Sequence, residues 1–181
     1  MDQIAAQAAV SKQTGYKQFA DKERLFAEVV LGVTGTVDGF VDVVERALGH
    51  SAHVEHDLHE LARTYVRTVV RPDVLRMRRL LIGQASRFPE LGRAYYERGP
   101  ERVIAAIAAC FEELMARGLL RAGDPLLAAQ HYAFLVLAIP LDRALVCGDD
   151  QFSPAQLDSL AESGVEVFLR AYGLPGDARG R

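Results

Sequence analysis

The sequence is poor in cysteine, has no excess of positive charge and contains no long apolar run, and each of these features excludes a class of protein. Cys110 and Cys147 are too few for a disulfide framework, so we expect two buried thiols in a reducing cytosol. The formal net charge of −3 argues against broad coating of nucleic acid, but it leaves room for a local DNA-binding segment. Because no signal peptide or membrane-spanning run can be recognised, we expect a cytoplasmic protein without membrane contact.

Motifs for catalysis are also lacking. The sequence shows no phosphate-binding loop, no nucleophile with a plausible base and no convergent pair of carboxylates, so we expect neither an enzyme nor a cofactor. One pattern resembles a metal site, because His50, His53, His56 and His59 recur at every third residue. A step of three residues turns each ligand by about 60° around a helix, so at most two neighbours and a carboxylate could converge. We therefore expect a polar loop that leads into a helix, and no metal.

The apolar residues recur at the intervals of three and four that are typical of amphipathic helices. One such stripe predicts a single long helix from Asp21 to Leu48, with a length of roughly 40 Å. Further helices are predicted over about 58–70, 73–88, 89–98, 100–118, 124–147 and 153–173. No strand signal is as strong as these, so the chain is predicted to be all-α.

The last two predicted helices share one kind of start, in which an N-cap residue precedes a proline: Asp124-Pro125 and Ser153-Pro154. The first of them is apolar on nearly every side and must be covered all round, partly by a second subunit. Pro140 should bend this helix, and Gly164 in the last helix permits close approach of another backbone. Doubled by a two-fold axis, the two helices would form a four-helix dimer interface.

The N-terminal segment reads as two short helices joined by a tight turn, followed by a third helix. Ser11 is suited to cap the second short helix, which runs to about Phe19, and Asp21 to cap the third. This arrangement predicts a helix-turn-helix, whose second helix enters the DNA major groove. The residues expected to contact DNA are Ser11, Lys12, Gln13, Thr14, Tyr16, Lys17 and Lys22.

Two passages carry a resemblance to a known family. The passage IAAQAAVSKQTGYKQFADKERLF, over residues 4–26, resembles the DNA-binding signature of the TetR family of bacterial transcriptional regulators. The passage RLLIGQASRFPELGRAYYERGPERV, over 79–103, is similar to the C-terminal regulatory domain of one branch of that family. The resemblance implies a partial helix-turn-helix domain over 1–28 and a helical ligand-binding and dimerisation domain over 29–181. It also implies a homodimeric repressor that a small, largely apolar effector releases from double-stranded operator DNA.

The sequence departs from the family pattern at several positions. Ala9 stands where the turn usually has glycine, Gly15 where an apolar residue usually packs inward, and Gln18 where His or Tyr is usual. Gln84 stands where the branch often has Glu, which weakens the expectation of a carboxylate contact to ligand. A complete helix normally precedes the motif, whereas Met1 falls inside the second helix of the pattern. We expect that an internal methionine was taken as the start; the alternative is a truncated product, a helical homodimerisation module that no longer binds DNA.

Candidate effector contacts come from inward-facing stripes of adjacent predicted helices, where plain core residues are also expected. Of these candidates, His131 is polar in an apolar setting, so it could orient a ligand or be a hydrogen-bonded core residue. Arg76, Arg78 and Arg79 read mostly as a solvated face, although an arginine here could pair with an acidic ligand. The candidate residues are Tyr65, Leu81, Phe88, Phe111, His131 and Phe134.

Overall fold

The fold consists of helices joined by short loops. The computed structural model describes residue 32 and residues 35–148 and 151–174, and it contains no strand in these parts of the chain. The helices are a helix over 35–48, α3 (Val54–Val69), α4 (Pro72–Gln84), α5 (Pro89–Arg98), α6 (Pro100–Ala116), α7 (Pro125–Cys147) and α8 (Pro154–Tyr172). The predicted all-α class is confirmed.

Local sequence signals explain where these helices begin. The Asp124 carboxylate accepts hydrogen bonds from the backbone N–H groups of Leu126 and Leu127 at the start of α7. Ser153 forms a reciprocal capping box with Gln156 at the start of α8. Both predicted N-caps are therefore confirmed.

The predicted helix over 73–88 is too long at its C-terminal end, because α4 stops at Gln84. Phe88 has φ −133° and ψ 69° and serves instead as the N-cap of α5. The ring of Pro89 disfavours helical geometry in the residue before it, which favours a break between α4 and α5 at Phe88.

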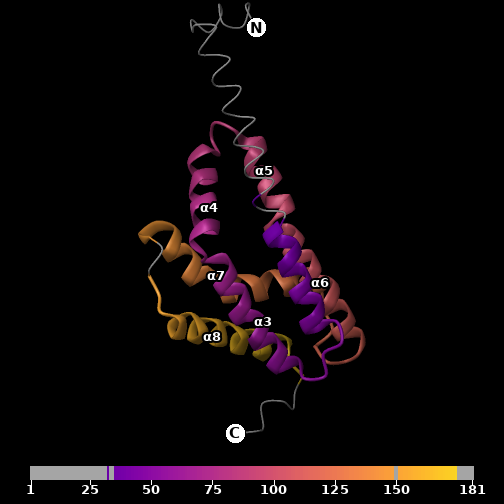
Figure 1. The fold of residues 1–181 in the computed structure, drawn as a ribbon. Helices are drawn as coiled ribbons and strands as arrows, with labels where there is room; N and C mark the ends of the chain where they lie inside the picture. The colour runs from indigo at the N-terminus through magenta and orange to yellow at the C-terminus, as the bar shows by residue number, and fades with distance from the viewer. Residues whose placement is uncertain (1–31, 33–34, 149–150, 175–181) are drawn as a thin grey trace, which may run out of the picture.

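The helices enclose one core, with α7 and α8 lying side by side across the direction of α3 and α4 (Figure 1). Phe111 of α6, Tyr132 of α7 and Phe168 of α8 meet at its centre, with ring centroids 5.3 to 5.8 Å apart. The buried Tyr132 hydroxyl donates a hydrogen bond of 2.7 Å to the backbone carbonyl of Leu58 in α3. This contact ties α7 to α3 and satisfies a polar group that would be costly to bury alone.

Gly164 allows α8 to approach the backbone of α7, as the sequence predicted. A Cβ atom at this position would lie 2.6 Å from the carbonyl oxygen of Leu135 and 3.1 Å from the Cα of Val136. α7 continues through the buried Pro140, and the bend expected there stays a prediction. The two helices thus meet at a point that has room only for a hydrogen side chain.

One side of α7 is not covered within the single chain. Phe134 and Ile139 are each 63% exposed, and His131 is exposed as well. The expectation that His131 and Phe134 face inward is therefore wrong for the single chain, because a helix that is apolar all round does not indicate which side packs inward. The expectation of two buried thiols is half wrong: burial raises the pKa of the Cys110 thiol, but Cys147 is exposed.

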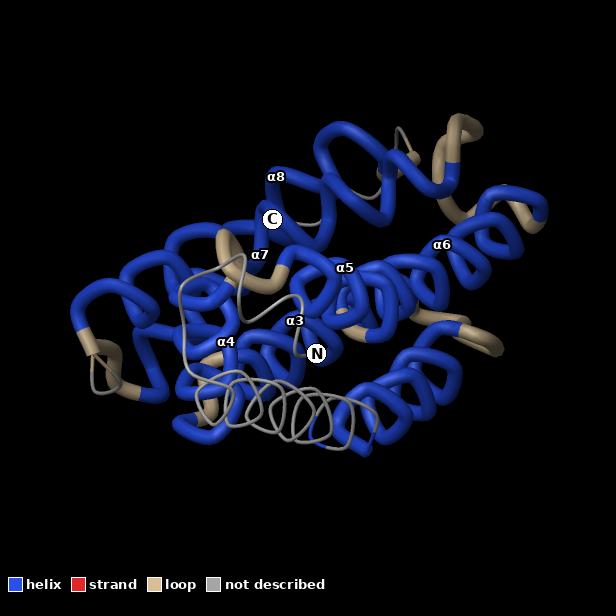
Figure 2. The backbone as a smooth tube through the Cα atoms, turned by 90° about the horizontal axis from the view of Figure 1, so that it is seen from above, coloured by secondary structure: helices blue, strands red, loops and turns tan. Residues whose placement is uncertain are grey.

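The composition of α7 also bears on membrane contact. Among the described helices, α7 alone is long and apolar enough to cross a bilayer by length and composition. The buried central helix of a soluble protein passes the same test, and α7 packs against both α6 and α8 (Figure 2). This finding is therefore weak evidence for a membrane span.

Candidate functional site

A small, mostly apolar cavity lies where five helices meet. Its volume is about 60 Å³, well below the roughly 300–1,000 Å³ of typical small-molecule sites. An effector of ordinary size must therefore displace side chains, and the unbranched Met77 is well suited to move. The lining residues are Gly32, Thr36, Val37, Phe40, Tyr65, Thr68, Val69, Val74, Met77, Arg78, Tyr95, Gly99, Pro100 and Val103.

The helix over 35–48 forms one wall of this cavity. Its Phe40 stacks on Tyr65 of α3, with ring centroids 4.6 Å apart and an angle of 28° between the planes. Its Asp38 forms an ion pair of 2.7 Å with Arg102 of α6. This helix follows the predicted DNA-binding segment in the sequence.

Three polar side chains stand out in the apolar lining. Burial raises the pKa of Tyr65 to about 12, because the phenolate is disfavoured away from water. Burial also raises the pKa of Tyr95, and the nearby positive charge of Arg78 opposes this shift without overcoming it. The Cζ of Arg78 lies 5.7 Å from the centroid of the Tyr95 ring. The cavity therefore combines two neutral phenols with one cation.

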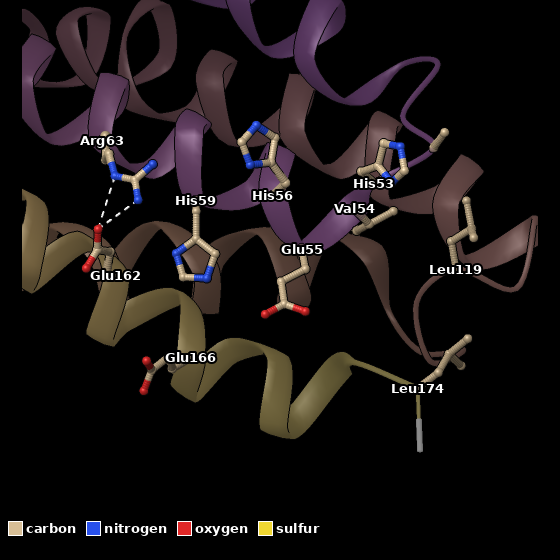
Figure 3. Close-up of a pocket in the computed structure, with 11 residues that line it drawn as sticks. His53, Val54, Glu55, His56, His59, Arg63, Leu119, Glu162, Glu166 and Leu174 are labelled. Atoms are coloured by element: carbon tan, nitrogen blue, oxygen red, sulfur yellow. Dashed lines mark hydrogen bonds and ion pairs between the residues drawn. The ribbon is translucent and has the colours of Figure 1, made fainter. Parts of the chain in front are cut away.

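A second, larger hollow of about 730 Å³ lies between the N-terminal half of α3 and the C-terminal half of α8 (Figure 3). It is polar: His56 and Glu166 are among its lining residues, and Glu55 and His59 of α3 point toward α8. Arg63 of α3 and Glu162 of α8 form an ion pair of 2.7 Å at one end, and this hydrogen bond raises the pKa of Arg63. Within the described residues, no group of three His, Cys, Asp or Glu side chains could hold a metal ion.

No described residue of the helix over 35–48 lines this polar hollow. The predicted polar loop that leads into a helix is confirmed. His50 and His53 lie in the connection over 49–53, and His56 and His59 lie in α3, which begins at Val54. Only three of these four histidines line the hollow.

The six residues predicted to contact an effector do not gather in one place. Tyr65 alone lines the apolar cavity. Leu81 and Phe111 are core residues, and Phe88 is half-buried beside the core. Exposed His131 forms a hydrogen bond of 2.6 Å with the hydroxyl of Tyr172 on α8. The role of all six in ligand binding stays a prediction.

Two of the three arginines of α4, Arg78 and Arg79, are half-buried and do not lie on the solvated face that was expected. Arg76 is exposed as expected, but Arg78 lines the cavity. Half-buried Arg79 donates hydrogen bonds to the backbone carbonyls of Ala144 and Leu145 near the end of α7. A signal for Arg78 was present: it lies three residues from buried Leu75 and three from buried Leu81, on the inward side of the helix. The residues predicted to contact DNA lie outside the described part of the chain.

Known proteins share this fold. The family model described as "AefR-like transcriptional repressor, C-terminal domain" matches residues 56–174. A TetR-family transcriptional regulator from Mesorhizobium loti is 43% identical, with a TM-score of 0.77, over 94% of this chain and 85% of that one. The flavonoid-responsive regulator FrrA is 33% identical, with a TM-score of 0.64, over 96% and 86% of the two chains. No curated protein matches.

A third solved structure, a TetR-family regulator from Pseudomonas syringae pv. tomato, is 26% identical with a TM-score of 0.65 and covers 97% of this chain and 86% of that one. Fold and sequence thus define a helical transcriptional regulator. More specifically, the chain belongs to the TetR family.

Proposed function

We propose that the protein is a cytoplasmic, homodimeric repressor that binds operator DNA through residues 1–28 and leaves it when a small, largely apolar effector enters the apolar cavity. The observation that carries this proposal is the composition of the cavity wall. Val37 and Phe40 belong to the helix that follows the predicted DNA-binding segment, and both line the cavity. An effector that requires a wider cavity would bind better to a conformation in which this helix has moved, and this differential affinity is what shifts the equilibrium away from DNA.

The likeness to a flavonoid-responsive regulator supports an effector with a large apolar surface. The cavity is suited to such a molecule, because aliphatic and aromatic side chains form most of its walls. Its polar groups are few and would serve to orient the effector.

The exposed apolar side of α7 supports a dimer through α7 and α8. Six of the eleven large apolar side chains that are exposed in the described residues lie on α7, and Val167 adds one from α8. An apolar surface of this kind on a regulator is typical of a subunit interface. The six residues on α7 are Leu126, Leu127, Phe134, Leu135, Ile139 and Val146.

The test combines sedimentation with a band shift on DNA that flanks the coding sequence. The wild-type chain should sediment as a dimer and give a shift that depends on DNA sequence and weakens with salt. Phe134→Asp should weaken the dimer by about a hundredfold or more, because the two-fold axis places two carboxylates in an apolar interface. The DNA shift should weaken with it.

Ile82→Asp is the matched control, because Ile82 is 64% exposed and belongs to α4, which is not one of the two helices of the proposed interface. It should leave both the dimer and the DNA shift unchanged. A wild-type dimer without a sequence-selective shift would refute DNA binding and favour a dimerisation module. A monomeric wild-type chain would refute the interface.

A further inference from the structure

The guanidinium of Arg78 is held at the cavity, and no carboxylate among the described residues forms an ion pair with it. The Nε atom of Arg78 is buried and has no hydrogen-bond acceptor. The cavity wall supplies no carboxylate either, because the described residues that line it include no Asp or Glu. A buried donor on a cation is costly to leave unpaired, because water cannot replace the missing acceptor.

The arginines near it show what the usual arrangement would be. Arg71 pairs with Asp73 at 2.7 Å, and Arg79 binds two backbone carbonyls of α7. Arg78 instead has a neutral partner, Tyr95, which lines the same cavity and which it contacts through the ring and a side-chain hydrogen bond. Among the described residues of the lining, Arg78 is thus the one charged side chain.

We propose that the effector is an organic acid, in which an apolar ring system fills the cavity and a carboxylate or phenolate binds Arg78. This inference rests on the proposed effector cavity and deepens it by assigning the chemical class of the effector. The planar guanidinium suits a carboxylate, because its N–H groups match the two oxygen atoms. Tyr65 and Tyr95 line the same cavity, and their hydroxyl groups, which burial keeps neutral at physiological pH, are hydrogen-bond donors of the kind that an oxygen anion accepts.

The position of Arg78 also gives the acid group a regulatory consequence. α4 carries Arg78, while the helix over 35–48 carries Phe40 on another wall of the cavity. An effector anchored by its anion on α4 directs its apolar body toward that helix. The acid group would then fix the position of the effector in the cavity, and the ring system would displace the helix over 35–48.

The experiment uses a pair of probes of nearly equal shape, 2-naphthoate and 2-naphthamide, at neutral pH. Only the first carries a negative charge. The chain contains no tryptophan, so naphthalene fluorescence excited beyond the tyrosine band reports binding without protein emission. The wild-type chain should bind naphthoate about ten- to hundredfold more tightly than naphthamide, as expected for a charge-assisted hydrogen bond.

Arg78→Met keeps an apolar stem of similar reach and removes the charge. It should abolish the preference for naphthoate while naphthamide binds as before, which also shows that the cavity is intact. Arg78→Lys should retain part of the preference, because the charge remains but the planar fork is lost. Arg76→Met, an exposed arginine on the same helix, should change neither affinity.

The outcomes separate this inference from the function on which it rests. Equal affinity of the wild-type chain for the two probes, or a preference that survives in Arg78→Met, overturns the acid assignment and leaves the effector cavity standing. Failure of both probes to bind overturns the assignment and the cavity together. If Arg78→Met does not fold, Arg78→Lys takes its place, and an undiminished preference for naphthoate in that variant overturns the assignment to Arg78.

Discussion

Replacing Gly164 with alanine tests how closely α7 and α8 pack. The added Cβ would lie 2.6 Å from the carbonyl oxygen and 2.9 Å from the carbonyl carbon of Leu135. Both are backbone atoms in the middle of α7, so no side-chain rotation can remove the clash. α8 must shift away from α7, which loosens contacts around the fully buried Val165 and Phe168.

The change in the free energy of unfolding caused by Gly164→Ala is the difference between two opposing effects. Replacing glycine by alanine inside a helix gains about 1 kcal/mol from backbone propensity. Overpacking of a rigid core costs about 1–3 kcal/mol, and a contact with backbone atoms belongs at the upper end of that range. The net loss should be about 2 kcal/mol, which lowers the melting temperature by about 4–8 °C in a chain of this size.

Gly92→Ala is the matched control, because Gly92 lies inside α5 and an added Cβ there would meet nothing within 4 Å. It should raise stability by up to about 1 kcal/mol. Thermal and urea unfolding, followed by circular dichroism at several protein concentrations, measures both variants and separates folding from dimer dissociation. If Gly164→Ala were as stable as Gly92→Ala, the close packing of α7 and α8 described here would be refuted.

Two further predictions concern single side chains. Tyr65 has a folded-state pKa of about 12 against an ordinary value of 10.0. The contribution of its neutral hydroxyl to the free energy of unfolding is therefore complete below pH 10 and is lost as the pH rises through 12. The loss should reach about 2–3 kcal/mol. The urea midpoint of the wild-type chain should therefore fall more steeply between about pH 9 and 12 than that of Tyr65→Phe. Identical slopes for the two chains would contradict the burial of this hydroxyl. Ser153→Ala removes the N-cap of α8 and should cost about 1 kcal/mol in urea unfolding, whereas Ser159→Ala, an exposed change inside the same helix, should not destabilise. Equal stability of the Ser153→Ala variant and the wild-type chain would count against the capping box.

The sequence predicted those features that depend on local chemistry. Asp124 and Ser153 identified the starts of α7 and α8, because a polar cap followed by proline acts within one helical turn. The end of α3 before Pro72 and the close approach at Gly164 were also predictable, since proline and glycine restrict or permit backbone geometry by themselves.

Features that depend on tertiary packing were harder to predict. α7 is apolar on nearly every side, so its periodicity could not show that Phe134 faces outward while Tyr132 is fully buried. A charged residue such as Arg78 is solvated in most helices, and only the convergence of other helices makes it part of a cavity. The effector site is thus defined by contacts between segments that are distant in sequence.

The small volume of the apolar cavity has a consequence for the dose response of the proposed regulator. An effector must supply the free energy that separates the walls before it gains any contact, so its apparent affinity is lower than its affinity for the opened form. Molecules that bind weakly cannot meet this cost and leave the equilibrium unchanged. The packing of Phe40, Tyr65 and Met77 around about 60 Å³ would therefore set a concentration threshold that filters out small metabolites with little apolar surface.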